Sequence, residues 1–174
     1  NGSEFPIIEW AKEVAKTTAE MIAHWMRVGF VHGVMNTDNM SIHGLTIDYG
    51  PYGWLEDYSP AWTPNTTDKS RRRYRYGNQP QIGAWNVARF LEAISPLVEN
   101  KDELQAVLEI YISRYEECSD SMWAAKLGMN EFTKEDVEMV SKLNLLLQKV
   151  ETDMTIFFRE LCHLKEPKIE QLEY

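Results

Sequence analysis

Two short stretches decide the fold of this chain: residues 32–39, His-Gly-Val-Met-Asn-Thr-Asp-Asn, and residues 47–50, Ile-Asp-Tyr-Gly. The first stretch ends in Asn39, and the second carries Asp48. Mg²⁺ takes oxygen ligands, and it usually binds to proteins through one or two side chains together with the phosphates of a nucleotide. An amide oxygen and a carboxylate suit that role, so the two stretches predict a Mg²⁺ site with Asn39 and Asp48 as its protein ligands.

The spacing within the first stretch matches a kinase catalytic loop at all but one position. Such a loop reads His-x-Asp, then four residues, then Asn, and an Asp on the following loop also binds the metal. His32 and Asn39 keep this spacing, but Val34 stands where kinases have the catalytic Asp. A different carboxylate, Asp38, lies directly beside Asn39. The metal ligands of a kinase are thus kept, whereas the carboxylate lies at a different position of the loop. This combination predicts nucleotide binding with a chemistry that differs from that of kinases.

The chain resembles the selenoprotein O family from about residue 7 to about residue 164. Four stretches carry the resemblance: HGVMNTDNMSI (32–42), GLTIDYGPYG (44–53), TPNTTD (63–68) and YGNQP (76–80). The resemblance implies a protein-kinase-like fold and the transfer of AMP, not phosphate, from ATP to hydroxyl groups of Ser, Thr or Tyr in proteins. It also implies that Asp38 accepts the proton, that Asn39 and Asp48 bind Mg²⁺, and that Asp48 lies near ATP.

Two alternatives to this function stay open. The kinase-like spacing also suits a phosphotransferase, although Val34 counts against it. A non-catalytic helical interaction module is the other alternative, because no Gly-rich loop and no strand carrying a Lys precedes His32, and kinase-like folds need both. The resemblance implies that an N-terminal lobe of the same protein supplies them, so we expect residues 1–174 alone to be inactive.

The expected fold is mainly α, and α+β overall: a protein-kinase-like large lobe with a short β-hairpin at the metal site, followed by a helical bundle. Residues 1–5 contain a sequence that common cloning sites encode, and we exclude them from the fold. The rest of the chain divides into a large lobe at 6–164 and a tail at 165–174. Within the lobe we expect a catalytic loop (32–40), a metal loop (48–53), a long loop (49–80) and a helical part (81–164).

Apolar periodicity predicts the regular elements. A helix is expected at 7–28, ending at Gly29, and further helices at 82–96 and 102–127. A Thr133/Asp136 capping box predicts the start of a last helix that continues to Leu161. Two short strands, 40–42 and 45–47, are expected to form a hairpin around His43-Gly44, which would bring Asn39 and Asp48 together.

The long loop occupies the place of a kinase activation segment, and loops of this length are usually functional or flexible. Its arginines, Arg71, Arg72, Arg73 and Arg75, suit either a solvated loop or a contact with an anion or an acidic substrate. Asn78 and Gln79 suit either helix capping or a contact with phosphate or a target protein. His32 could act as a base, but at this position of a kinase-like loop we expect it to brace the loop backbone.

Charge and hydropathy exclude some partners. The formal net charge is -9, from 27 Asp and Glu against 18 Lys and Arg, which argues against nucleic acid. No apolar run approaches the roughly 18 residues of a membrane helix. The partners that the resemblance implies are ATP, Mg²⁺ and protein substrates, in the cytoplasm of a bacterium or the mitochondrion of a eukaryote.

Overall fold

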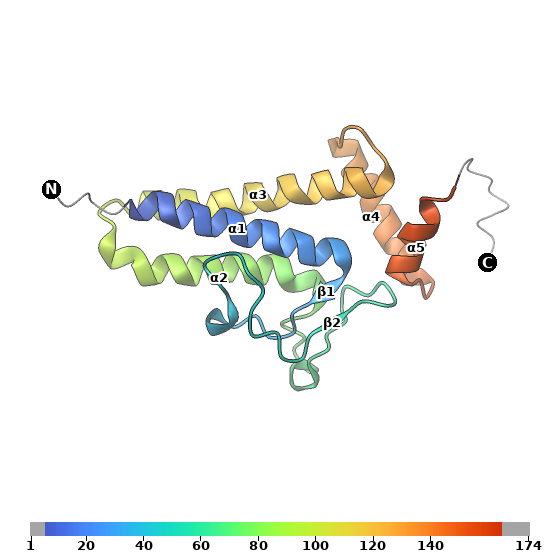
Figure 1. Ribbon diagram of the computed structural model, residues 1–174, viewed down its shortest axis with the longest axis horizontal. Helices are drawn as coiled ribbons and strands as arrows, with labels where there is room; N and C mark the ends of the chain where they lie inside the picture. The colour runs from blue at the N-terminus through green and yellow to red at the C-terminus, as the bar shows by residue number, and fades with distance from the viewer. Residues whose placement is uncertain (1–5, 165–174) are drawn as a thin grey trace.

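The computed structural model describes residues 6–164 and shows a mainly helical chain with a small antiparallel sheet (Figure 1). Residues 1–5 and the tail at 165–174, both set apart from the lobe by the sequence analysis, lie outside the described residues. The elements are α1 Ile7–Val28, β1 Phe30–Val31, β2 Gly53–Trp54, α2 Gln79–Ile94, α3 Asp102–Leu127, α4 Lys134–Lys149 and α5 Met154–Leu161. The expectation of a mainly α chain is confirmed. Within residues 6–164, no helix combines the length and the apolar character needed to cross a membrane.

The main core forms where α1, α2 and α3 pack together (Figure 1). The buried face of α1 carries Ala11, Ala15 and Ala19, all fully buried and four residues apart. Such small side chains at helical spacing form a single stripe and let a neighbouring helix approach closely. Gly29, with a φ of 73°, ends the helix in the left-handed conformation that glycine favours, as predicted.

Gly83 lets α2 pack closely against α1 and α3. A Cβ atom at this position would lie 2.2 Å from Ile22 Cδ1 and 2.3 Å from the Tyr111 hydroxyl oxygen. That hydroxyl donates a 2.8 Å hydrogen bond to the carbonyl of Pro80. The contact fixes the N-terminal end of α2, which in turn positions the catalytic loop.

The prediction of a hairpin at 40–47 is wrong, because its two strands do not form. A turn does form there, since the Gly44 N–H donates to the Ser41 carbonyl, but residues 40–42 and 45–47 do not pair. They bind elsewhere: Gly44 packs against Thr17 of α1, and the Trp25 indole N–H donates to Thr46 Oγ1. The sheet instead pairs β1 with β2, with Phe30 opposite Trp54 and Val31 opposite Gly53.

The last predicted helix is interrupted. Helix α4 opens on the expected Thr133/Asp136 capping box and ends at Lys149, and α5 begins at Met154. Asp153 caps α5 by accepting from the Ile156 N–H at 2.7 Å. The long loop binds the interruption, because the Tyr58 N–H donates to the Thr152 carbonyl and the Met154 N–H to the Glu56 carbonyl. These backbone bonds outside the helix stabilise the break.

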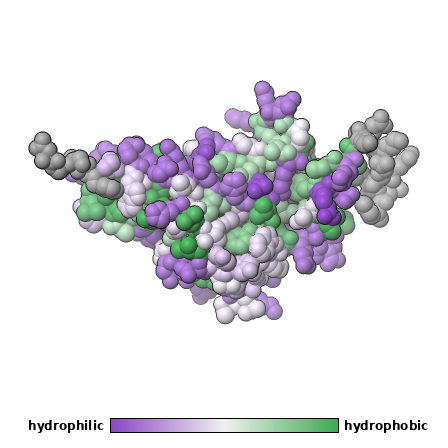
Figure 2. Space-filling view, viewed as in Figure 1, coloured by the Kyte–Doolittle hydropathy of each residue, from purple (hydrophilic) through white to green (hydrophobic). Residues whose placement is uncertain are grey.

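Several apolar side chains that contribute to the helical periodicity are exposed. Trp85 of α2 is 40% exposed, Val137 of α4 is 49% exposed and Val150 is 67% exposed. In the space-filling view, polar and apolar side chains mix along the helices, and the part formed by the loops below α1 is mainly pale (Figure 2). Apolar residues at helical spacing therefore predict the helix correctly, but not all of them are buried against other elements.

Candidate active site

The Gln79 side chain binds the backbone at the start of the catalytic loop. Its side chain is fully buried at the start of α2. Its Nε2 donates to the Phe30 carbonyl at 2.9 Å, and its Oε1 accepts from the His32 N–H at 3.0 Å. The amide therefore binds the chain as a neighbouring strand would. Both sequence-based interpretations of Gln79, a helix cap or a contact with phosphate or a target protein, are corrected by this burial.

Two more buried amides bind the next turns of the loop. Asn65 Nδ2 donates to the Gly33 carbonyl at 3.0 Å, and Asn86 Nδ2 donates to the Met35 carbonyl at 3.0 Å. Neither residue was predicted from the sequence to have this role. A signal for Asn65 was available, because its Oδ1 accepts from the Thr67 N–H in the turn that Pro-Asn-Thr-Thr favours. Buried polar groups of this kind are retained because leaving their partners unpaired is costly.

Gly33 brings the catalytic loop against the metal loop. Its φ is 84°, and a Cβ there would lie 2.3 Å from the Pro51 carbonyl oxygen. Only glycine combines this left-handed conformation with so close a backbone contact. The two stretches that the sequence singled out are therefore neighbours in space.

His32 braces both loops, and the expected bracing role is confirmed. The ring is fully buried, its Nε2 lies 2.9 Å from the Ile47 carbonyl oxygen, and its Nδ1 accepts from the Val34 N–H. This pattern requires a neutral ring with the proton on Nε2. Burial lowers the pKa of His32 below its ordinary value, against the opposing effects of the Ile47 carbonyl and the Asp48 carboxylate. His32 is therefore a structural group and a poor proton acceptor.

Asp38 and Asn39 lie on a single turn of 3-10 helix, Thr37–Asn39. Asn39 Nδ2 donates to the Val34 carbonyl at 3.0 Å, which leaves the amide oxygen for another partner. The Asp38 side chain is exposed on the same turn. Asn39 is thus oriented by the loop, while the Asp38 side chain is exposed to solvent.

Asp48 lies directly after the residue that His32 binds. It is exposed and has a φ of 47°, a conformation that residues other than glycine seldom adopt. Such residues cluster at functional sites because the surrounding structure must hold them there. The Gly50 N–H closes the turn by donating to the Asp48 carbonyl.

The donor set of Asn39 and Asp48 fits Mg²⁺ that is shared with a nucleotide. Among residues 6–164 there is no group of three or more His, Cys, Asp and Glu side chains that could hold a metal ion. A tightly chelated structural metal is therefore not what these residues suit. One amide oxygen and one carboxylate are instead the protein share expected when phosphates and water complete the shell.

The arginine-containing part of the long loop is tied to the catalytic loop. The Tyr74 hydroxyl donates to Asn36 Oδ1, two residues before Asp38. Asn78 Nδ2 donates to the Arg73 carbonyl at 2.6 Å, so Asn78 neither caps α2 with its side chain nor points away from the loop. The segment is therefore ordered by hydrogen bonds and lies next to the catalytic loop.

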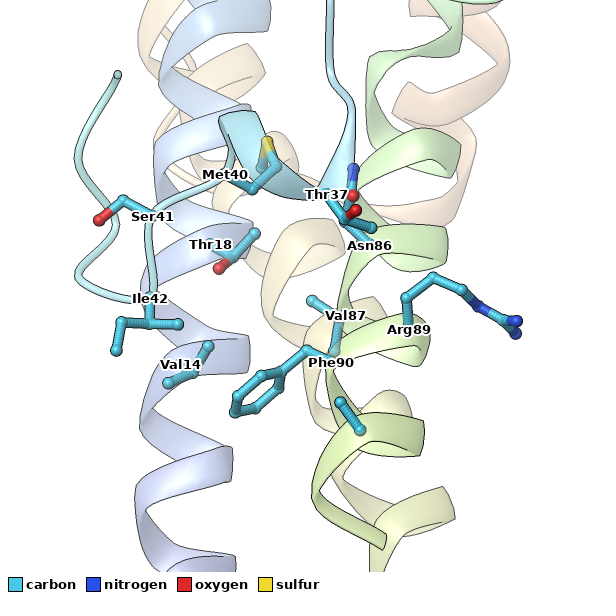
Figure 3. A pocket seen from close by; sticks show the side chains of 11 residues that line it. Val14, Thr18, Thr37, Met40, Ser41, Ile42, Asn86, Val87, Arg89 and Phe90 are labelled. Atoms are coloured by element: carbon cyan, nitrogen blue, oxygen red, sulfur yellow. The ribbon is translucent and has the colours of Figure 1, made fainter. Parts of the chain in front are cut away.

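A cavity of about 310 Å³ lies behind the catalytic loop (Figure 3). Its walls come from α1, α2 and residues 37–42, including Thr37, Met40, Val87 and Phe90. Asp38, Asn39 and Asp48 do not line it. The cavity therefore touches the back of the turn that carries Asp38, and the three candidate residues face elsewhere.

Comparisons with known proteins show which proteins this chain resembles. The family model described as protein adenylyltransferase SelO matches residues 3–173. Proteins called protein nucleotidyltransferase YdiU are similar in sequence: the one from Rhodopirellula baltica is 58% identical over 88% of this chain and 29% of its own length. Those from Flavobacterium johnsoniae and Xanthomonas campestris pv. campestris are 51% and 54% identical, over 96% and 91% of this chain and 33% and 30% of their own lengths. The chain thus spans about a third of the length of these curated relatives.

Proposed function

Since the chain belongs to the protein adenylyltransferase SelO family, we propose that it forms the Mg²⁺- and ATP-binding part of an enzyme that transfers AMP to hydroxyl groups of proteins. The observation that carries the proposal is the turn Thr37–Asn39. It orients the Asn39 amide through Val34 and exposes the Asp38 carboxylate beside it. The names of the relatives describe nucleotidyl transfer by proteins about three times as long, so the activity is proposed for the whole protein that contains this chain.

Asp38 is the proposed proton acceptor. As the hydroxyl oxygen of Ser, Thr or Tyr forms its bond to the α-phosphorus of ATP, the bond to pyrophosphate breaks and the hydroxyl proton moves to Asp38. A positioned general base of this kind contributes about 10²- to 10⁴-fold to the rate. Val34, at the place of the kinase base, is apolar and cannot accept a proton, which favours this assignment over phosphate transfer with ordinary kinase chemistry.

Asn39 and Asp48 are the proposed Mg²⁺ ligands, and Asp48 also lies near ATP. When bound, Mg²⁺ would neutralise charge on the phosphates. The chain's own contribution is to hold the two oxygens on neighbouring loops: Asn39 through Val34, and Asp48 through the His32 bond to Ile47. Held in this way, the two oxygens would orient the bound phosphates relative to Asp38.

A separate N-terminal lobe is part of the proposal. Kinase-like sites use a Lys and a phosphate-covering loop from that lobe, and neither is found among residues 6–164 in the positions that precede His32. We therefore expect residues 1–174 alone to bind Mg-ATP weakly and to transfer no AMP. A micromolar dissociation constant in a calorimetric titration of this chain would contradict that expectation.

The decisive experiment uses the full-length protein that contains this chain, incubated with Mg²⁺, a mixture of proteins and ATP labelled at either the α- or the γ-phosphorus. Label in protein from α-labelled ATP alone supports AMP transfer. Label from γ-labelled ATP alone would identify a kinase-like phosphotransferase, and no label from either would favour a non-catalytic interaction module.

A further inference from the structure

We propose that residues 71–75, the arginine loop, bind an acidic segment of the protein that receives AMP. This inference rests on the proposed function and specifies its substrate class. The loop contains Arg71, Arg72, Arg73 and Arg75, and four lines of evidence support the assignment: unpaired charge, a fixed backbone, an accessible guanidinium edge and closeness to Asp38.

The charge of the arginine loop is not balanced within the described part of the chain. The ion pairs among residues 6–164 involve other cations, and none joins the four arginines to a carboxylate. The neighbouring Asp68 is engaged by backbone groups, since its carboxylate oxygens accept from the Arg73 and Tyr74 N–H groups at 2.9 and 2.7 Å. In a chain with a net charge of -9, this loop is a local site of attraction for an acidic partner.

The loop is held in one conformation by its own hydrogen bonds. Besides the two bonds to the Asp68 carboxylate, the Arg72 N–H donates to the Asp68 carbonyl at 2.6 Å, and Arg72 has a φ of 48°. Asn78 Nδ2 closes the other side through the Arg73 carbonyl. A binding loop that is already ordered loses less conformational entropy when a partner binds, which favours specific recognition over a solvated tail.

Arg73 presents the part of its side chain that recognises carboxylates. Its guanidinium carbon lies 4.7 Å from the centre of the exposed Trp85 ring, and Arg89 approaches the same ring at 5.7 Å. Stacking uses the face of the guanidinium and leaves its N–H edge accessible. That edge donates no hydrogen bond to the residues that the structure describes. A carboxylate could therefore bind it in the bidentate geometry that arginine favours.

The position of the loop suits a protein segment more than a nucleotide. The Tyr74 hydroxyl bonds to Asn36 near the proposed base, so a substrate hydroxyl at Asp38 would have its flanking residues close to the loop. Figure 1 shows the green segment around residue 70 projecting below the helices, away from the bundle. Nucleotides usually bind in concave sites, whereas an exposed projecting loop can contact an extended peptide.

The test uses the full-length protein and two fluorescent peptides: one has a single Ser flanked by Glu residues, and the other has Gln in place of every Glu. Binding is measured by fluorescence anisotropy, and AMP transfer with α-labelled ATP. The variants are R71Q/R73Q, the charge-preserving R71K/R73K, and K149Q/R159Q as a matched control on α4 and α5. Melting temperatures check that each variant is folded.

The wild type should bind the acidic peptide about tenfold more tightly than its Gln counterpart, as two exposed charge pairs allow. R71Q/R73Q should lose this preference, R71K/R73K should keep most of it, and K149Q/R159Q should keep all of it. Equal binding of both peptides by the wild type, or an unchanged preference in R71Q/R73Q, would overturn the inference.

Two further outcomes would also overturn it. Weaker ATP binding by R71Q/R73Q would mean that the loop holds phosphates, and competition by single-stranded RNA as strong as by the acidic peptide would mean a nucleic-acid contact. Transfer of AMP without a preference for the acidic peptide would refute this inference alone. The absence of AMP transfer to any protein would refute the proposed function and, with it, the substrate assignment.

Discussion

The catalytic loop and the metal loop lie against each other but are held in different ways. Buried amides of Gln79, Asn65 and Asn86 bind the catalytic loop through its carbonyl and N–H groups. The metal loop is attached through the Ile47 carbonyl, and its candidate ligand, Asp48, is exposed with a positive φ. Buried hydrogen bonds thus support the loop that carries the proposed proton acceptor, while the candidate metal ligand lies on a tight exposed turn.

The largest expected effect concerns Asp38. In the full-length protein, Asp38→Asn should lower AMP transfer by about 10²- to 10⁴-fold, because the amide cannot accept the hydroxyl proton. The melting temperature should stay unchanged, since the side chain is exposed. Asp57→Asn, an exposed position on the long loop, serves as the control and should keep normal turnover. Normal turnover in Asp38→Asn would remove this residue from the mechanism.

The next effect concerns Gln79, one of the buried amides that hold the catalytic loop. Gln79→Ala should destabilise the fold by about 3 kcal/mol, because it leaves the Phe30 carbonyl and the His32 N–H buried without a partner. Gln81→Ala, two residues away and exposed, should change the free energy of unfolding by less than about 0.5 kcal/mol. Urea unfolding of both variants measures the difference. Equal stabilities would show that the amide does not hold the loop.

The link between the two loops predicts a pH dependence. Burial depresses the pKa of folded His32 below its ordinary value of 6.5, so the unfolded chain binds more protons just below that pH. The contribution of His32 to stability is therefore fully present above about pH 6.5 and falls as the pH drops through that value. His32→Gln should show a flatter dependence between about pH 7.5 and about pH 5. His163→Gln, an exposed position, should retain the wild-type slope, and a slope unaffected by His32→Gln would contradict the assignment.

The smallest effect concerns the exposed turn. Asp48→Gly should stabilise the fold slightly, by about 0.5 kcal/mol, because glycine adopts a positive φ without the steric cost of a side chain. Asp48→Ala keeps that cost and should give no gain. Thermal unfolding of the two variants measures the difference, and a clear loss of stability in Asp48→Gly would show that the carboxylate itself holds the loop.

Local sequence patterns predicted the helices well. They did not predict the long-range hydrogen bonds that hold the catalytic loop. The bounds of α1 and α3, the Gly29 end and the Thr133/Asp136 capping box follow from apolar spacing and end signals. The hairpin at 40–47 failed because Thr17 and Trp25, far away in sequence, bind that segment. Asn86 was not assigned to the site and the role of Gln79 was misread, because a buried amide that binds a distant carbonyl has no local signature. The spacing around His32 predicted a site there, and both that site and the roles of Asp38, Asn39 and Asp48 stay predictions.

The most direct test of the account is the affinity of the full-length protein for Mg-ATP, measured by calorimetry in Asp38→Asn and Asp48→Ala side by side. If Asp38 is the proton acceptor and Asp48 the metal ligand, Asp38→Asn should bind Mg-ATP nearly as tightly as the wild type. Asp48→Ala should bind it at least about tenfold more weakly, since a ligand to the cation is lost. An equal loss in both variants, or no loss in Asp48→Ala, would contradict this division of roles between the two loops.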